Sequence, residues 1–87
     1  MMNEYISSVN PKALLADGFE DAIIGYVEGA DQTPVALYDR DKCIDILMTQ
    51  DKMSEADAWE YFEYNVIGSY MGKHTPLFAS LLIHERA

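Results

Sequence analysis

Two helix-start signals in the middle of the chain, at Asp39 and Ser54, constrain its fold more than any other feature. Asp39 precedes the segment Arg40–Gln50, and an aspartate in this position accepts hydrogen bonds from the first free amides of a helix. Ser54 is followed three residues later by Asp57, the spacing at which a serine hydroxyl and an acidic side chain each serve the other's backbone amide. We therefore expect a helical hairpin, with one helix over Arg40–Gln50 and another after Ser54.

The apolar residues of both expected helices recur at three- and four-residue spacing, which places them on one face. In the first helix these residues are Cys43, Ile44, Leu47 and Met48. In the second helix they are Ala58, Trp59, Phe62, Val66 and Tyr70. We expect both faces to lie in the core, with Cys43 as a small buried apolar group. Gly68 and Gly72 weaken the end of the second helix.

Segments rich in β-forming residues flank the hairpin. Ala22–Glu28 is typical of a strand, with a bulge at Gly25. Val35–Tyr38 follows a turn-forming segment and Pro34, so we expect it to pair back on the first strand as a β-hairpin. Leu77–Ile83 is apolar enough for a third, largely buried strand, although so short a run is also compatible with a helix.

A short helix is expected before the first strand. Asn10 is a suitable N-cap, Pro11 suits the first helical position, and Gly18 can take the left-handed conformation with which helices end. Leu14 and Leu15 would be its buried residues.

The length and the order of these elements predict a single small α+β domain over residues 10–87, preceded by a flexible N-terminus over residues 1–9. The expected order is helix, strand, strand, helix, helix, strand, with a three-stranded sheet that carries its helices on one face. The other face and the edges of such a sheet lack cover, which favours a homodimer or another homo-oligomer.

The charge of the chain restricts its partners. Asp and Glu number 15 against 6 Lys and Arg, which gives a net charge of -9 and a pI near 4.3. Binding to nucleic acid requires clustered basic residues, and an anionic membrane surface would repel this chain, so neither is expected as a partner. A basic protein surface is the natural complement of the acidic chain. The alternative is that the acidity only keeps a small domain soluble.

The sequence predicts neither a metal site nor a cofactor. A single cysteine, Cys43, excludes an intramolecular disulfide, and no pair of Cys or His residues stands at zinc-ligand spacing. His74 and His84 have no nucleophile motif around them and are expected to be surface or partly buried residues. Met1–Val9 lacks the features of a signal peptide, and no apolar run approaches the roughly 20 residues of a membrane span, so we expect a reduced, intracellular protein.

One pattern raises the question of catalysis. Asp39-Arg40-Asp41 follows an apolar strand and is similar to the Asp-x-Asp motif of phosphotransferases in the haloacid dehalogenase class, which implies magnesium-dependent chemistry with Asp39 as nucleophile. The rest of that family's pattern has no convincing counterpart, and 87 residues cannot build the required sheet. Helix capping and dipole compensation by Asp39 and Asp41 explain the same residues, so no catalytic residue is assigned.

The outer side of the second helix is the candidate working surface. Asp57, Glu60, Tyr61 and Tyr64 fall within about one third of the helix circumference at 100° per residue, and Ile67 and Met71 lie at the border. We name these residues the acidic-aromatic face. Tyrosine is enriched in interfaces, so the face predicts binding of a protein partner. Alternatively, Tyr61 and Tyr64 cover the neighbouring helix.

Several segments together resemble a family of small acidic proteins encoded by tailed bacteriophages. The matching segments are Asp17–Gly25, Tyr38–Ile44, Met53–Ala58, Glu60–Gly68 and Thr75–Pro76. The resemblance covers most of Asp17–Phe78 and implies a phage context and expression in the cytoplasm of a bacterial host. It implies no catalytic residue and no mechanism.

The favoured hypothesis is a non-enzymatic phage accessory protein that binds a bacterial protein through the acidic-aromatic face. The partner would be a nuclease, a defence factor or another nucleic-acid enzyme, whose basic DNA site the acidic surface imitates. The alternative is a structural or assembly role in the virion or the phage replication machinery. A small magnesium-dependent phosphotransfer enzyme that uses Asp39 and Asp41 ranks last.

Overall fold

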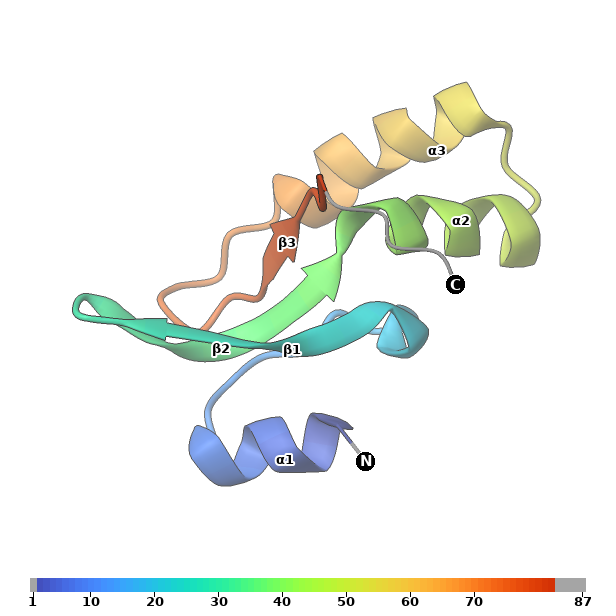
Figure 1. Cartoon of the computed structure of the whole chain (residues 1–87). Helices are drawn as coiled ribbons and strands as arrows, with labels where there is room; N and C mark the ends of the chain where they lie inside the picture. The colour runs from blue at the N-terminus through green and yellow to red at the C-terminus, as the bar shows by residue number, and fades with distance from the viewer. Residues whose placement is uncertain (1, 83–87) are drawn as a thin grey trace.

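The computed structural model describes residues 2–82, and these residues form the predicted α+β domain with a three-stranded mixed sheet and three helices in the predicted order (Figure 1). The elements are α1 (Met2–Val9), the 3-10 turn η1 (Glu20–Ala22), β1 (Ile23–Gly29), β2 (Gln32–Asp39), α2 (Arg40–Gln50), α3 (Glu55–Tyr61), the π-helix η2 (Phe62–Ile67) and β3 (Leu77–Ala79). None of the helices in this part of the chain has the length and apolar character that a bilayer crossing requires.

The sheet has the order β1-β2-β3. β1 and β2 form an antiparallel hairpin, and β3 pairs parallel to β2, from Leu37 opposite Leu77 to Asp39 opposite Ala79. The register of the hairpin shifts between Ile23 and Gly25, where the sequence predicted a bulge. In Figure 1, α1 lies beneath the β1–β2 hairpin, and the α2–α3 hairpin continues from the end of β2.

The short helix at the start of the chain was predicted at the wrong place. The helix spans Met2–Val9, and residues 11–18, where it was expected, form no helix. The Asn10 side chain instead donates from Nδ2 to the Pro34 carbonyl at 2.7 Å, a partner far along the chain. Residues 2–9, expected outside the domain, contribute Ile6 to the core with an exposed fraction of 1%.

The segment between α1 and η1 is held by hydrogen bonds to distant residues. The Leu14 amide donates to the His74 carbonyl at 3.0 Å, and the Ala16 amide donates to the Tyr38 hydroxyl at 2.7 Å. Leu14 and Leu15, expected to be buried, remain 37% and 39% exposed. Tertiary hydrogen bonds therefore override the local helix signal.

The helical hairpin was predicted correctly, with Asp39 and Ser54 as its N-caps, but the return bond expected from the Asp57 side chain to the Ser54 amide is absent from the described residues. The Asp39 carboxylate accepts from the amides of Asp41 and Lys42 at 3.0 and 3.4 Å, and the Ser54 hydroxyl accepts from the amide of Asp57 at 3.2 Å. The side chains of the hairpin that lie buried in the core are Cys43, Ile44, Ile46, Leu47, Ala58 and Phe62.

Phe62 lies at the centre of an aromatic cluster that joins the hairpin to the sheet. Its ring meets those of Phe19, Trp59 and Phe78 edge-on, with centroids 6.5, 6.5 and 5.2 Å away. Phe78 in turn stacks on Tyr38 at 5.2 Å. Edge-to-face contacts at these separations are favourable beyond the apolar area that they bury.

The second helix of the hairpin changes its geometry halfway. It winds as an α-helix to Tyr61 and then as the wider π-helix η2, which ends with a bond from the Gly68 amide to the Glu63 carbonyl at 3.1 Å. Of its predicted core face, Ala58 and Phe62 are buried and Trp59 and Val66 are partly buried. The prediction for Tyr70 was wrong, because the helix has ended before it and its side chain is 76% exposed.

The third strand is shorter than predicted. β3 spans Leu77–Ala79 in place of Leu77–Ile83, and 80–82 form no strand. Position 83 of the predicted strand and His84 lie outside the described residues.

Candidate functional site

Every residue of the acidic-aromatic face is exposed. Asp57 and Glu60 lie on the solvent side of α3. The exposed fractions of the apolar members are 41% for Tyr61, 77% for Tyr64, 44% for Ile67 and 70% for Met71. Tyr64 leaves most of its ring in solvent, so it does not serve as cover for the neighbouring helix. The exposure of the face is as predicted, and its role in binding stays a prediction.

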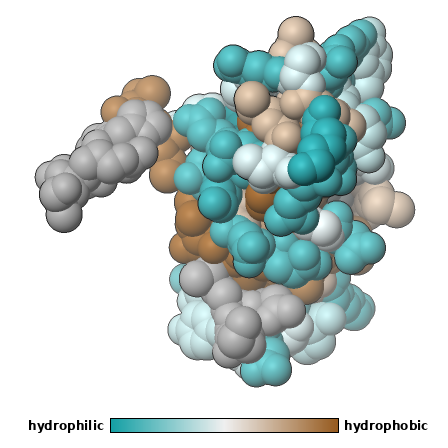
Figure 2. Space-filling model, turned by 90° about the vertical axis from the view of Figure 1, so that its right-hand side faces the viewer, coloured by the Kyte–Doolittle hydropathy of each residue, from teal (hydrophilic) through white to brown (hydrophobic). Residues whose placement is uncertain are grey.

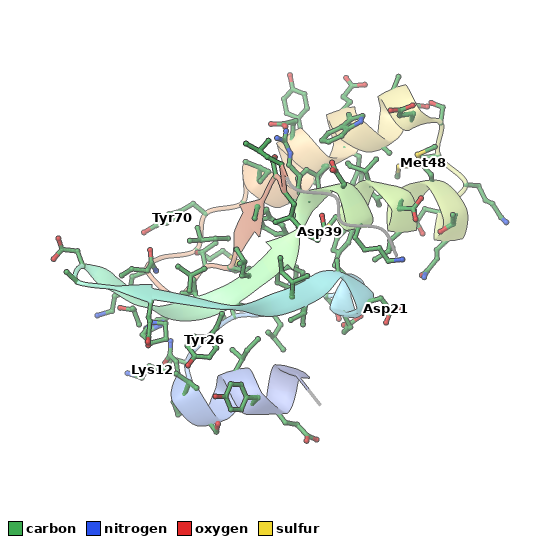
Figure 3. All side chains as sticks on the ribbon, viewed as in Figure 1. Lys12, Asp21, Tyr26, Asp39, Met48 and Tyr70 are labelled. Atoms are coloured by element: carbon green, nitrogen blue, oxygen red, sulfur yellow. The ribbon has the colours of Figure 1, made fainter. Side chains whose placement is uncertain are left out.

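Tyr70, which was expected in the core, is exposed next to Met71 of the acidic-aromatic face. Its side chain points away from the body of the molecule in Figure 3 and is 76% exposed. The signal that could have moved it to the surface is Gly68, which sits at the end of η2. With Tyr70, the exposed apolar side chains of this region follow one another along a single short segment, from Tyr61 to Met71.

A tight turn after η2 positions Met71. The Met71 amide donates to the Thr75 hydroxyl at 2.8 Å, and that hydroxyl donates to the Gly72 carbonyl at 2.6 Å. Gly72 has φ +97°, a backbone conformation that residues other than glycine rarely adopt. The turn thus holds the end of the face in place through its own hydrogen bonds.

Two hollows flank this segment. A hollow of about 210 Å³ lies between η2 and the loop after α1, and its lining includes Leu14, Tyr61 and Met71. A second, of about 670 Å³, is bordered by Ile67 and Tyr70 together with residues of β2 and β3. Tyr61 thus borders one hollow and Tyr70 borders the other.

The acidic residues of the face are available to a partner. Within residues 2–82, Asp57 and Glu60 form no ion pair, whereas Glu63 pairs with the Arg40 guanidinium at 2.5 Å. Arg40 also lies over the Trp59 ring, 4.8 Å from its centroid, and donates to the Ser80 hydroxyl at 3.2 Å. Arg40 thus links the start of α2 to η2 through Glu63, and it does not neutralise Asp57 or Glu60.

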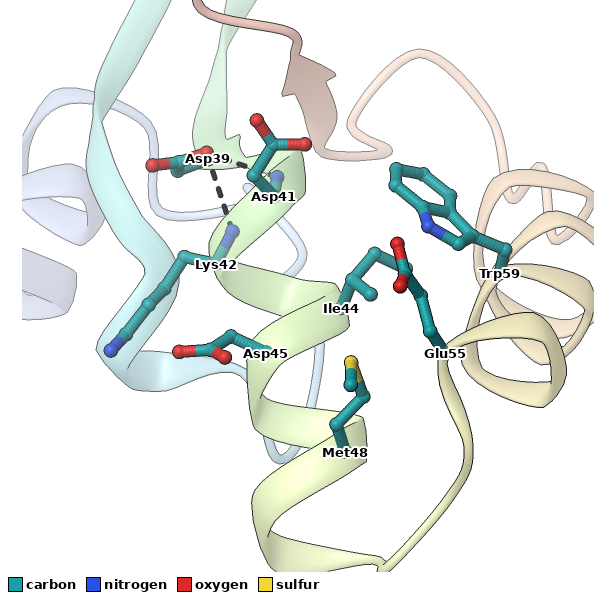
Figure 4. Close-up of a pocket in the computed structure, with 8 residues that line it drawn as sticks. All are labelled: Asp39, Asp41, Lys42, Ile44, Asp45, Met48, Glu55 and Trp59. Atoms are coloured by element: carbon teal, nitrogen blue, oxygen red, sulfur yellow. Dashed lines mark hydrogen bonds between the residues drawn. The ribbon is translucent and has the colours of Figure 1, made fainter. Parts of the chain in front are cut away.

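A third hollow surface lies between α2 and α3 (Figure 4). This α2–α3 groove has a volume of about 610 Å³. Its lining residues are Asp39, Asp41, Lys42, Ile44, Asp45, Met48, Glu55 and Trp59. It contains both residues of the Asp-x-Asp pattern, and the capping interpretation of Asp39 is confirmed by its bonds to the first amides of α2. Among the described residues, no group of three or more His, Cys, Asp and Glu side chains is placed to hold a metal ion.

Cys43 is buried in the core, and His74 is partly buried. Cys43 is 0% exposed, as predicted, and its burial, with a smaller effect of the Asp39 charge, raises the pKa of its thiol to about 12. His74 is half-buried, and its Nδ1 lies 3.1 Å from Asn10 Nδ2, which agrees with the expectation of a partly buried histidine.

The surface on the side of the α2–α3 loop is mainly hydrophilic. Figure 2 views the molecule from the side of the loop between α2 and α3, where hydrophilic residues cover most of the surface and hydrophobic areas appear between them. The exposed apolar residues at the end of the described chain include Leu81 and Leu82, with exposed fractions of 37% and 91%.

The resemblance to small phage proteins stays a prediction. Comparison of the chain with models of protein families, with curated protein sequences and with solved structures finds no match.

Proposed function

We propose that this chain is a phage accessory protein that acts by binding another protein through the acidic-aromatic face. The observation that carries the proposal is the run of exposed apolar side chains from Tyr61 to Met71, which includes Tyr64 at 77% and Tyr70 at 76%. Large apolar side chains that gather on one surface are typical of interaction sites, and tyrosine combines contact area with a polar tip. The phage context rests on the resemblance of the sequence.

The charge of the face supports a basic partner. Among the described residues, the carboxylates of Asp57 and Glu60 form no ion pair, and the chain has a net charge of -9. Complementary charge speeds association and excludes acidic competitors. We therefore propose a bacterial protein with a basic surface, such as a nuclease or a defence factor in the host cytoplasm, for which the acidic face competes with DNA.

Photo-crosslinking tests the proposal at single residues. Benzoylphenylalanine, an aromatic photo-crosslinker, replaces Tyr64 in one variant and Tyr5 in a matched control, because Tyr5 is an exposed tyrosine on α1, 58% exposed. Both variants are expressed in bacteria, irradiated and analysed by mass spectrometry. A bacterial protein crosslinked at position 64 but not at position 5 supports the proposal. Equal crosslinking at both positions, or none at position 64, contradicts it.

Charge reversal separates the acidic part of the face from the aromatic part. The double change Asp57→Lys and Glu60→Lys should weaken binding to the captured partner and reduce its dependence on salt, because it removes two unpaired carboxylates. Glu28→Lys, an exposed acidic position on β1, serves as the control. An unchanged affinity of the double variant would remove the acidic residues from the binding site.

A structural or assembly role is the second candidate, favoured by the edges of the sheet. β1 and β3 each have one unpaired side within the described sheet. Leu77, the first residue of β3, is 41% exposed, and Leu82, which follows the strand, is 91% exposed. Open edges with apolar neighbours favour self-association. Sedimentation at several concentrations should then show a dimer that Leu82→Ser weakens, and mass spectrometry of purified phage particles should contain the protein. A concentration-independent monomer that is absent from the particles would contradict this role.

A further inference from the structure

The α2–α3 groove lies on the opposite side of α3 from the acidic-aromatic face. At 100° per residue of α3, Glu55 and Trp59 fall within about 40° of each other, whereas Asp57 and Glu60 lie about 120–180° away from the mean direction of these two. A ligand in the groove therefore leaves the acidic-aromatic face free. The groove and the face can be tested separately.

The groove combines an apolar floor with an acidic rim. In Figure 4, Ile44 and Met48 of α2 form the floor, and Trp59 and Glu55 of α3 form one wall. The carboxylates of the lining belong to Asp39, Asp41, Asp45 and Glu55. Lys42 is the basic residue of this lining. An occupant of complementary chemistry has apolar side chains for the floor and several positive charges for the rim.

The distribution of the carboxylates indicates an extended ligand. In the described part of the chain, Asp41, Asp45 and Glu55 form no ion pair, and no three acidic side chains converge as a metal site would require. Asp41 and Asp45 come from α2, whereas Glu55 comes from the start of α3. Separated charges suit a ligand that carries its positive charges along its length, as a peptide does.

The molecule already binds one guanidinium with the same kind of groups. Arg40 lies 4.8 Å from the centroid of the Trp59 ring and pairs with Glu63. Arginine favours this combination of an aromatic face and a carboxylate, since it stacks on the ring and donates to the acid at once. The groove presents the pair Trp59 and Glu55 on its own side. We propose that the α2–α3 groove binds a basic amphipathic peptide segment of a partner protein, with arginines on the rim and apolar side chains on Ile44 and Met48.

Trp59 makes the test direct, because it is the single tryptophan of the chain. The probe is the peptide acetyl-Arg-Arg-Leu-Leu-Arg-Arg-amide, which has no fluorescence of its own, and the readout is tryptophan emission. We expect a saturable change with this peptide. Replacing every arginine by citrulline, its neutral analogue, should weaken binding by about tenfold or more, because each exposed ion pair contributes up to about fivefold. Absence of a saturable signal, or equal affinity for the citrulline peptide, overturns the proposal.

Matched variants locate the peptide in the groove. Asp45→Asn and Glu55→Gln should each weaken binding by about two- to fivefold, and Lys42→Gln should strengthen it. Asp51→Asn removes the same charge at the end of α2, outside the groove lining, and should change the affinity less than Asp45→Asn does. Equal effects of Asp45→Asn and Asp51→Asn would show only a general attraction to the acidic chain and would overturn the site. Circular dichroism confirms that each variant is folded before its affinity is compared.

Discussion

Replacing Asn10 with alanine tests how the loop after α1 is held to the rest of the fold. Asn10 is 8% exposed, and its Nδ2 donates to the Pro34 carbonyl at 2.7 Å and lies 3.1 Å from His74 Nδ1. Its Oδ1 accepts from the Lys12 amide at 3.1 Å, which fixes the orientation of the side-chain amide. Asn10→Ala removes all of these contacts and leaves the Pro34 carbonyl without the donor that Asn10 supplies.

The size of the effect follows from these bonds. A hydrogen bond contributes about 0.5–1.5 kcal/mol net to the free energy of unfolding. The loss of stability is larger when the remaining partner is left buried and unpaired. The Lys12 amide is on an exposed residue and can bind water, so most of the loss comes from Pro34 and His74. We expect Asn10→Ala to lower the free energy of unfolding by about 2–3 kcal/mol. In a domain of this size that loss lowers the melting temperature by about 10–20 °C.

Urea unfolding, followed by Trp59 fluorescence and circular dichroism, measures the change. Asn65→Ala, at an exposed asparagine of η2, is the control and should stay within about 0.5 kcal/mol of the parent. Asn10→Asp keeps the size and the acceptor but removes the donor, so it should cost at least as much as alanine. A loss below about 0.5 kcal/mol for Asn10→Ala would refute the role of these bonds.

The remaining predictions concern backbone conformation and the buried thiol. Lys52 has φ 62° after α2, so Lys52→Gly should raise the free energy of unfolding in urea by about 0.5–1 kcal/mol. Gln50→Gly, at the last residue of α2, should instead lower it, by up to about 1 kcal/mol. Gly68→Ala should lower it by about 1–3 kcal/mol although alanine favours helices, because the new Cβ would lie 2.8 Å from the Tyr64 carbonyl oxygen; a gain in stability would contradict this clash. Cys43 should react with iodoacetamide at pH 8 only after denaturant is added, since its pKa is raised to about 12, and rapid reaction of the native protein would contradict its burial. Because only the unfolded chain loses the thiol proton between about pH 9 and 12, the free energy of unfolding should fall over that range, and less so in Cys43→Ala.

The helical hairpin was predictable because its signals are local. The hydrogen-bonding partners of Asp39 and Ser54 lie within three residues of each cap, so the sequence contains both halves of each interaction. The exposure of Asp57 and Glu60 in α3 follows from the same helical period. For these parts, a short window of sequence includes everything that decides the conformation.

The start of the chain was not predictable in this way. Asn10 and Pro11 form a pattern that is typical of a helix start, but the side chain of Asn10 binds Pro34 and His74, which no local window contains. The second helix likewise ends at Ile67, before Tyr70, so the regular period does not extend to this residue. The α2–α3 groove was missed for a related reason, since Trp59 meets Asp41 and Ile44 only after the hairpin has folded.

The parallel pairing of β2 with β3 has a consequence for the order of folding. β1 and β2 meet across a turn of two residues, whereas the partners Tyr38 and Phe78 are separated by the entire helical hairpin and η2. Closing the longer loop costs more chain entropy, so contacts of high sequence separation form late. We expect β3 to dock last, after the β1–β2 ribbon has formed. Amide protons on the edge of β2 that faces β3 should then exchange with solvent sooner than those bonded to β1.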